Sequence, residues 1–139
     1  MNNRIIDYIK SNARNKIIFH REEIPGIVPV NIGQLLSESI FNFKETSKIS
    51  MKVLIELDNI FHTCLIEHDL YGKFLSIANL GILFEPGLKL DFFRLLDSYS
   101  QNNVLFVQWD GEMDSENLYF LTKENGVKIH IKNISHIIL

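Results

Sequence analysis

The chain has 139 residues, of which 46% are hydrophobic and 22% charged, the composition of an ordinary globular domain. We therefore expect one domain over residues 1–139 with its own hydrophobic core. Residues 1–44 carry six Lys and Arg against four Asp and Glu, a net +2, and residues 45–139 carry eight against thirteen, a net −5. Neither part has the strongly basic character of a nucleic-acid-binding protein, so direct nucleic-acid binding by the isolated chain is not expected.

Cysteine content and hydropathy exclude further classes. The single Cys64 cannot form an intramolecular disulfide, and no Cys/His cluster has the spacing of a zinc site. No apolar run approaches the roughly 20 residues that a membrane helix needs, and residues 1–4 lead into an amphipathic pattern instead of the apolar block of a signal peptide. We expect a cytoplasmic protein that contacts no membrane and holds no cofactor or metal.

In the first part of the chain, helical and strand patterns alternate. Apolar residues at three- and four-residue spacing predict a short helix over residues 3–13, and the apolar run at 16–20 predicts a first buried strand. After a polar loop, residues 27–30 indicate a short second strand, which Pro29 restricts to an edge or a strand start. Asn31 is a suitable cap for the next helix, with Gln34 in the capping-box position.

The middle of the chain has the pattern of a parallel α/β unit. The longest predicted helix covers residues 49–68, and a buried strand follows at 74–79. After the break at Pro86 and Gly87, residues 88–100 predict a helix, and residues 104–109 another buried strand. Strand, loop, helix and strand in this order predict a parallel sheet.

The C-terminal part changes character. Residues 118–122 and 127–131 predict two strands joined by an Asn125-Gly126 turn, which is a strong hairpin signal, and residues 134–139 predict a last strand or docked tail. The expected fold class is therefore α/β, with a parallel sheet and an antiparallel hairpin near the C-terminus.

The predicted strand ends are where an α/β sheet would bind a nucleotide. A phosphate-binding P-loop needs Gly-x-x-x-x-Gly-Lys followed by Ser or Thr. The loop after the first strand, residues 20–26, has one Gly, no Lys, and two carboxylates, Glu22 and Glu23, that would repel phosphate. The strand at 74–79 ends in Ala78 and Asn79, with no carboxylate to hold magnesium, so the sequence argues against nucleotide hydrolysis.

Other candidate chemistry has a simpler structural interpretation. The five His residues are scattered and lack the carboxylate pattern of a catalytic triad. Cys64 lies on the apolar stripe of a predicted helix, which favours a buried small hydrophobe. The alternating carboxylates of Asp110, Glu112, Asp114 and Glu116 lack the remaining spacing of a calcium loop, so a solvated acidic loop is favoured.

The central residues resemble a known family. The run 78–96, with Phe84-Glu85-Pro86 ahead of Lys89 and Arg94-Leu95-Leu96, is similar to the small P-loop protein of BREX-type phage-defence systems. The similarity continues through Ser100-Gln101-Asn102 to Trp109-Asp110-Gly111. The resemblance implies a P-loop-NTPase-like three-layer sheet and an antiphage context. The family's P-loop would fall at residues 19–28, and its magnesium-holding Asp at Ala78, so both halves of the nucleotide chemistry are missing here.

The resulting hypothesis is a degenerate P-loop-like protein that serves as a non-catalytic interaction or regulatory subunit of a bacterial antiphage system. Its expected partners are other protein subunits of a defence complex, or further copies of itself. The candidate partner-contacting residues are Arg21, Phe84, Glu85, Lys89, Asp91, Arg94, Trp109 and Asp110.

Two alternatives stay open. In the first, Arg21 or Arg94 acts in trans on a neighbouring ATPase. In the second, the more basic N-terminal segment makes the chain a nucleic-acid adaptor of the complex, through Arg4, Lys10, Arg14, Lys16 and Arg21.

Overall fold

The computed structural model describes residues 3–43, 47–120 and 126–139. Its elements in chain order are α1 Asn3–Ile9, β1 Lys16–His20, β2 Val30–Asn31, α2 Ile32–Phe41, α3 Ile49–Cys64, β3 Ile66–His68, β4 Gly72–Ala78, the 3-10 turns η1 Gly81–Phe84 and η2 Pro86–Leu88, α4 Phe92–Ser100, β5 Val104–Gln108, β6 Asn117–Phe120, β7 Val127–His130 and β8 Ile137–Ile138.

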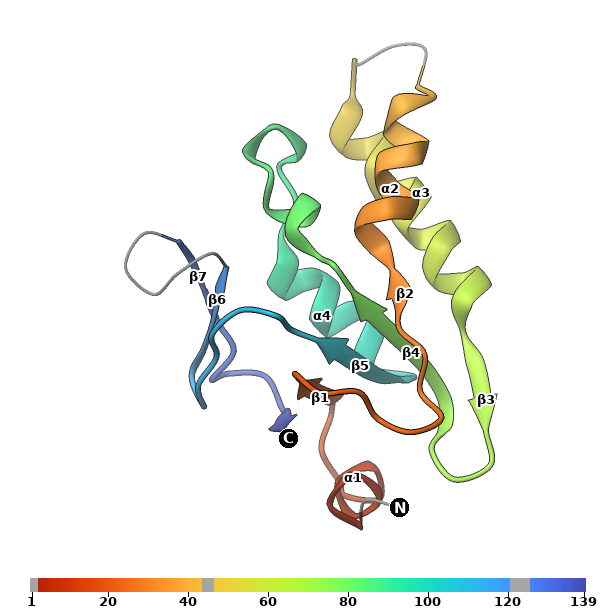
Figure 1. Cartoon of the computed structure of the whole chain (residues 1–139), viewed down its shortest axis with the longest axis vertical. Coiled ribbons are helices and arrows are strands. Elements are labelled where there is room, and N and C mark those ends of the chain that lie inside the picture. Colours follow the sequence, from red (N-terminus) through yellow and green to blue (C-terminus); the bar gives the residue numbers. More distant parts are fainter. Residues whose placement is uncertain (1–2, 44–46, 121–125) are drawn as a thin grey trace.

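The main sheet has the order β2-β4-β5-β1-β8, and all of these neighbours pair in parallel (Figure 1). The long pairings are β4 with β5 and β5 with β1, and β3 adds an antiparallel pairing to the first part of β4. A separate antiparallel hairpin is formed by β6 and β7. The expected fold class, α/β with a mostly parallel sheet and an antiparallel hairpin, is therefore confirmed.

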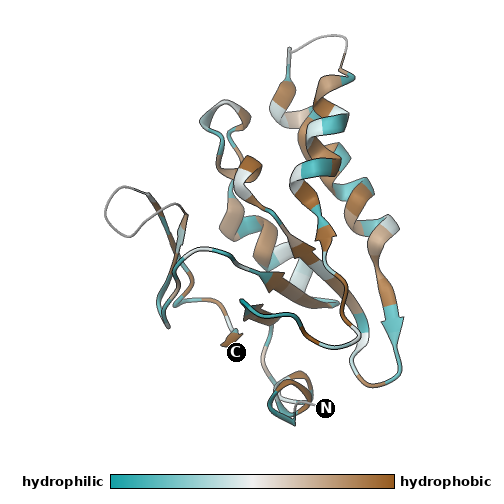
Figure 2. Cartoon of the chain, in the orientation of Figure 1, coloured by the Kyte–Doolittle hydropathy of each residue, from teal (hydrophilic) through white to brown (hydrophobic). Residues whose placement is uncertain are grey.

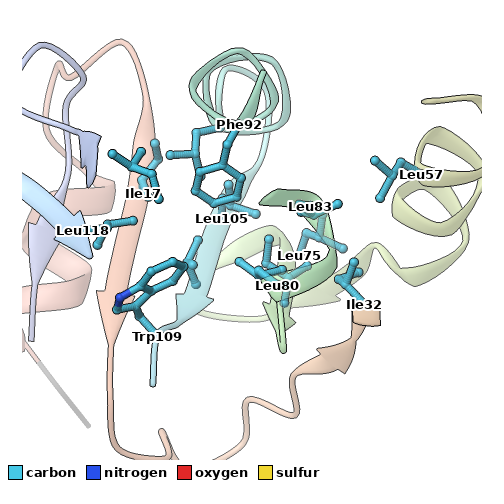
Figure 3. Close-up of a cluster of buried hydrophobic side chains, with 14 of the residues drawn as sticks. Ile17, Ile32, Leu57, Leu75, Leu80, Leu83, Phe92, Leu105, Trp109 and Leu118 are labelled. Carbon is cyan, nitrogen blue, oxygen red and sulfur yellow. The ribbon is translucent and has the colours of Figure 1, made fainter. Parts of the chain in front are cut away.

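Alternating strand residues give the sheet two buried faces. On one face Ile17, Leu75 and Leu105 pack with α2, α3, α4 and the hairpin in the larger core cluster (Figure 3). On the other face Ile18 and Phe106 pack with Ile5 of α1 in a smaller cluster. The three central strands are strongly hydrophobic while the helices carry both kinds of residue (Figure 2), as expected for a sheet covered on two sides.

Two predicted boundaries in the N-terminal part are wrong. The first helix ends at Ile9 instead of residue 13, because the Tyr8 hydroxyl donates to the Asn15 carbonyl at 2.8 Å and accepts from the Ile17 amide at 3.0 Å, which turns the chain into β1. The second strand is limited to Val30–Asn31 instead of 27–30, because residues 24–27 form a turn closed by the Ile27 amide on the Ile24 carbonyl at 3.0 Å.

The long helix predicted to reach residue 68 ends at Cys64, and Ile66–His68 form β3. His68 explains the reversal, since its Nδ1 accepts from the amides of Leu70 and Tyr71 at 3.1 and 3.2 Å and thereby closes a tight turn. Gly72 completes the turn at a φ of 73°, in the left-handed region that favours glycine. Cys64 is half-buried against the larger cluster.

The later elements follow the predictions more closely. The helix expected over residues 88–100 starts later, because Leu88 is the last residue of η2. Helix α4 begins at Phe92, where the Asp91 carboxylate accepts from the Arg94 amide at 3.2 Å. Strands β6 and β7 confirm the hairpin strands, while Asn125 of the predicted turn lies outside the described residues. The last strand is confirmed at Ile137–Ile138 and pairs in parallel with β1.

Within the described ranges, none of the helices combines the length and the apolar character needed to cross a membrane.

Candidate functional site

The C-terminal ends of β1, β4 and β5 lie at one edge of the sheet, the place where α/β proteins usually bind ligands (Figure 1). The connection from β1 to β2 contains no helix, so no helix N-terminus points its amides toward this edge from β1. Glu22 and Glu23 of this connection are exposed. The arrangement provides carboxylates where a phosphate site would need amide and lysine donors.

Hydrogen bonds join the end of β1 to the end of β5. The His20 carbonyl accepts from the Trp109 amide at 2.9 Å, and the Arg21 carbonyl accepts from the Gln108 side-chain amide at 3.2 Å. The guanidinium of Arg21, although exposed, donates to the Gly111 carbonyl at 2.7 Å. Arg21 therefore contributes to the closure of the strand ends in the isolated chain.

His20 is a buried polar residue at this edge that the sequence did not single out. Its side chain is 2% exposed, and its Nδ1 lies 2.8 Å from the Glu22 carbonyl. Burial lowers the pKa of the imidazole below its ordinary value, and the bond to the Glu22 carbonyl partly opposes that shift. The neutral ring donates from Nδ1, which leaves Nε2 as an acceptor that has no hydrogen-bond partner among the described residues.

The end of β4 is occupied by a side-chain contact with α2. Asn79, at a left-handed φ of 56°, donates from its amide to the Asn31 carboxamide oxygen at 2.7 Å, and its carbonyl accepts from the Gly33 amide at 2.9 Å. The same Asn31 oxygen accepts from the Gln34 amide at 2.9 Å, which confirms the predicted cap of α2. Asn79 thus holds the start of α2 against the sheet.

Trp109 follows β5 and is buried, with 4% of its surface exposed. Its indole nitrogen donates to the carbonyls of Glu112 and Tyr119 at 3.2 and 3.3 Å, and its ring lies 5.9 Å from that of Phe84 (Figure 3 shows Trp109 within the core). Phe84 is partly buried and also packs on Phe92, with ring centroids 4.9 Å apart. Both residues therefore connect the hairpin and η1 to the sheet.

Two open pockets border this edge. One of about 270 Å³ lies between the ends of β4 and β5 and the hairpin, where it is lined by Asn79 and by the exposed Asp110. A wider one of about 1010 Å³ lies between the loop after β1 and the first turn of α1, with Arg4, Arg21, Glu22 and Glu23 on its walls. Cationic and anionic groups alternate there, so the pocket does not present the single sign of charge that a phosphate site needs.

The acidic loop after Trp109 is organised by its own hydrogen bonds. The Asp114 carboxylate accepts from the amides of Glu116 and Asn117, both at 2.9 Å, and from the Tyr119 hydroxyl at 2.9 Å. Among residues 3–43, 47–120 and 126–139, no group of three His, Cys, Asp or Glu side chains is placed to hold a metal ion.

Three of the predicted partner-contacting residues come together elsewhere, in a groove between α3 and α4 that we call the α3–α4 groove. It has a volume of about 610 Å³, and Lys89, Asp91 and Arg94, all exposed, line it. Tyr99 closes one end, with its hydroxyl donating to the Asp58 carboxylate at 2.8 Å. Burial and this carboxylate raise the pKa of the Tyr99 hydroxyl, so it stays a protonated donor. Glu85, though exposed, is not part of the groove wall.

The apolar wall of this groove was not predicted from the sequence. Met51, Leu54 and Ile55 of α3 are exposed by 57%, 46% and 56%. They lie outside the stripe of Val53, Leu57 and Phe61 that α3 buries against the core. The signal was present in the sequence, since an amphipathic surface helix would carry polar residues at these outward positions.

Comparison of the chain with protein-family models, with curated proteins and with solved structures finds no significant match.

Proposed function

We propose that this protein is a non-catalytic interaction or regulatory subunit of a bacterial antiphage defence system, with a P-loop-like sheet that lacks the phosphate-binding loop. The defence context rests on the resemblance of residues 78–111 to the small P-loop protein of BREX-type systems. The sheet order supports this fold, because β1 lies in the interior of the sheet, between β5 and β8, with its C-terminal end at the edge where α/β sheets usually bind ligands.

The observation that carries the proposal is the chemistry of the strand ends. After β1 the chain offers Glu22 and Glu23, with no helix before β2, so a phosphate would meet repulsion without amide donors. After β4, the Asn79 amide already donates to Asn31, and no carboxylate stands at Ala78 or Asn79 to hold magnesium. These strand ends support a role without nucleotide hydrolysis.

Nucleotide binding gives the direct test. Isothermal titration with Mg-ATP and with Mg-GTP is expected to show no saturable binding up to about 1 mM, and a phosphate-release assay no turnover. The matched variant Glu22→Gln/Glu23→Gln removes the repulsion without supplying the lysine or the main-chain amides of a P-loop, so it is also expected not to bind. Saturable binding by the unaltered chain with a Kd well below that limit would refute the non-catalytic assignment.

The defence context has its own test. In a strain that carries the complete system, deletion of this gene is expected to reduce protection in a phage plating assay. A complementing copy with Glu22→Gln/Glu23→Gln should restore it, because these carboxylates are not needed for an interaction role. Unchanged protection in the deletion strain would contradict the assignment to a defence system.

A further inference from the structure

The α3–α4 groove has an apolar wall that nothing in the described chain covers. Met51, Leu54 and Ile55 project from α3, and the partly buried Leu90 and Leu95 face them from the other side. Each of the three α3 side chains leaves about half of its surface in water, and burial of such surface is the usual source of binding free energy. A contiguous row of this kind, rimmed by charged residues, is typical of a protein-binding surface.

The groove carries two cations, Lys89 and Arg94, and two carboxylates, Asp58 and Asp91, and these differ in whether they have partners within the chain. Among the described residues, neither Lys89 nor Arg94 has a side-chain hydrogen bond or an ion pair, and both are exposed. The two carboxylates of the groove are already engaged. Asp91 accepts from the Arg94 backbone amide, and Asp58 accepts from the Tyr99 hydroxyl at 2.8 Å while its other oxygen lies 3.6 Å from the His62 ring. The groove therefore offers two uncommitted cations beside apolar surface.

The walls of the groove decide the conformation of its occupant. Both long walls are helices, whose main-chain groups are bonded within the helix, so an extended peptide would find no strand edge to pair with. An amphipathic helix satisfies its own main chain and presents apolar side chains on one face. Carboxylates that flank that face would meet Lys89 and Arg94.

We propose that the α3–α4 groove binds an acidic amphipathic helix of a partner protein, with its apolar face on Met51, Leu54 and Ile55 and its carboxylates on Lys89 and Arg94. This inference rests on the proposed interaction function and names the class of partner. It concerns a surface formed by α3, residues 89–91 and α4, which is separate from the strand ends where nucleotide binding is tested.

The test uses the full chain as bait for a displayed library of peptides of about 16 residues, or four helical turns, in which apolar and charged positions are varied independently. Selected peptides are expected to carry apolar residues at three- and four-residue spacing flanked by Asp or Glu. The strongest is then synthesised with a fluorescent label and titrated by anisotropy, beside a version in which every Asp and Glu is replaced by Lys. The acidic peptide is expected to bind at least about 10-fold more tightly than the basic one.

Substitutions in this protein that reverse the charges of the groove, or place a charge on its apolar wall, show where the peptide binds. Lys89→Glu/Arg94→Glu is expected to weaken the acidic peptide at least about 10-fold and to improve the basic one. Glu at position 94 also suits the first turn of α4, so the helix should be retained. Ile55→Asp should abolish binding of either peptide. Matched surface controls are Lys128→Glu and Val28→Asp, since both residues are exposed and lie outside the groove.

Several outcomes would overturn the proposal. The first is that no selected peptide binds saturably, and the second is that the selected peptides show no preference for acidic residues. The third is that Ile55→Asp leaves peptide binding unchanged while its circular dichroism shows that the variant is folded. A concentration-dependent dimer in sedimentation velocity that Ile55→Asp abolishes would make a second copy of the chain the occupant instead. Nucleotide binding with intact peptide binding would refute the proposed non-catalytic role alone.

Discussion

Replacement of Trp109 tests whether this residue is a core anchor or a surface for partners. It is the single Trp of the chain, and it lies at the end of β5 with 4% of its surface exposed. Its ring centroid lies 5.9 Å from that of Phe84 and 6.4 Å from that of Phe92. Its indole nitrogen donates to the carbonyl of Glu112, ahead of β6, and to that of Tyr119, within β6. Removal of the side chain should therefore loosen the hairpin from the sheet.

The structure sets the expected magnitudes. Trp109→Ala removes a fully packed ring, and truncations of this kind lower the free energy of unfolding by about 3–5 kcal/mol. Trp109→Phe keeps most of the aromatic contact but removes the indole N–H, so the carbonyls of Glu112 and Tyr119 lose that donor. The expected cost of Trp109→Phe is smaller, about 1–3 kcal/mol.

Urea unfolding followed by far-UV circular dichroism measures these costs, because the variants lack the only Trp fluorophore. Val28→Ala is a suitable control, since Val28 is 77% exposed and its truncation should change the free energy of unfolding by less than about 0.5 kcal/mol. A cost below about 1 kcal/mol for Trp109→Ala would refute the core assignment and return Trp109 to the candidate partner surface.

Two further substitutions test the edge of the sheet. Gly33→Ala should lower the free energy of unfolding by about 1–3 kcal/mol in the same urea assay, because an added Cβ would lie 2.8 Å from the Asn79 carbonyl oxygen. An unchanged urea midpoint would show that this contact has room to adjust. The pKa of His20 is lowered in the folded state, so at pH values below the ordinary pKa the unfolded chain binds more protons than the folded chain. The free energy of unfolding should therefore fall as the pH drops through and below about 6.5. His20→Gln should flatten this acid-side fall in urea midpoints measured across that range, and an equally steep fall in the variant would argue against His20 as its source.

The two regions of interest differ in how they use their polar groups. At the strand ends, Asn79, Arg21 and Trp109 donate to atoms of the chain itself, so few donors remain for a ligand. At the α3–α4 groove, Lys89 and Arg94 make no such contacts within the described ranges. The closed strand edge, and a groove that pairs exposed apolar side chains with two cations free of partners among the described residues, support the proposed protein-binding role.

The sequence by itself determined most of the secondary structure and the fold class. Buried strands are readable at residues 16–20 and 104–108 because a strand covered on both faces is apolar throughout. The start of α2 was readable from Asn31, because an Asn cap satisfies a free helix amide locally. The absence of a P-loop pattern between β1 and β2 was also readable, since that motif is a local sequence.

Only the tertiary structure decided the rest. The end of α3 at Cys64 depends on the pairing of β3 with β4, which local helical periodicity cannot reveal. Trp109 and Arg94 were both candidate partner-contacting residues. Packing against Phe84 buries Trp109, whereas Arg94 is exposed in the first turn of α4. The α3–α4 groove arises from the packing of two helices that are distant in sequence. Its existence depends on which face each helix turns toward the shared core, and that is a property of the assembled fold.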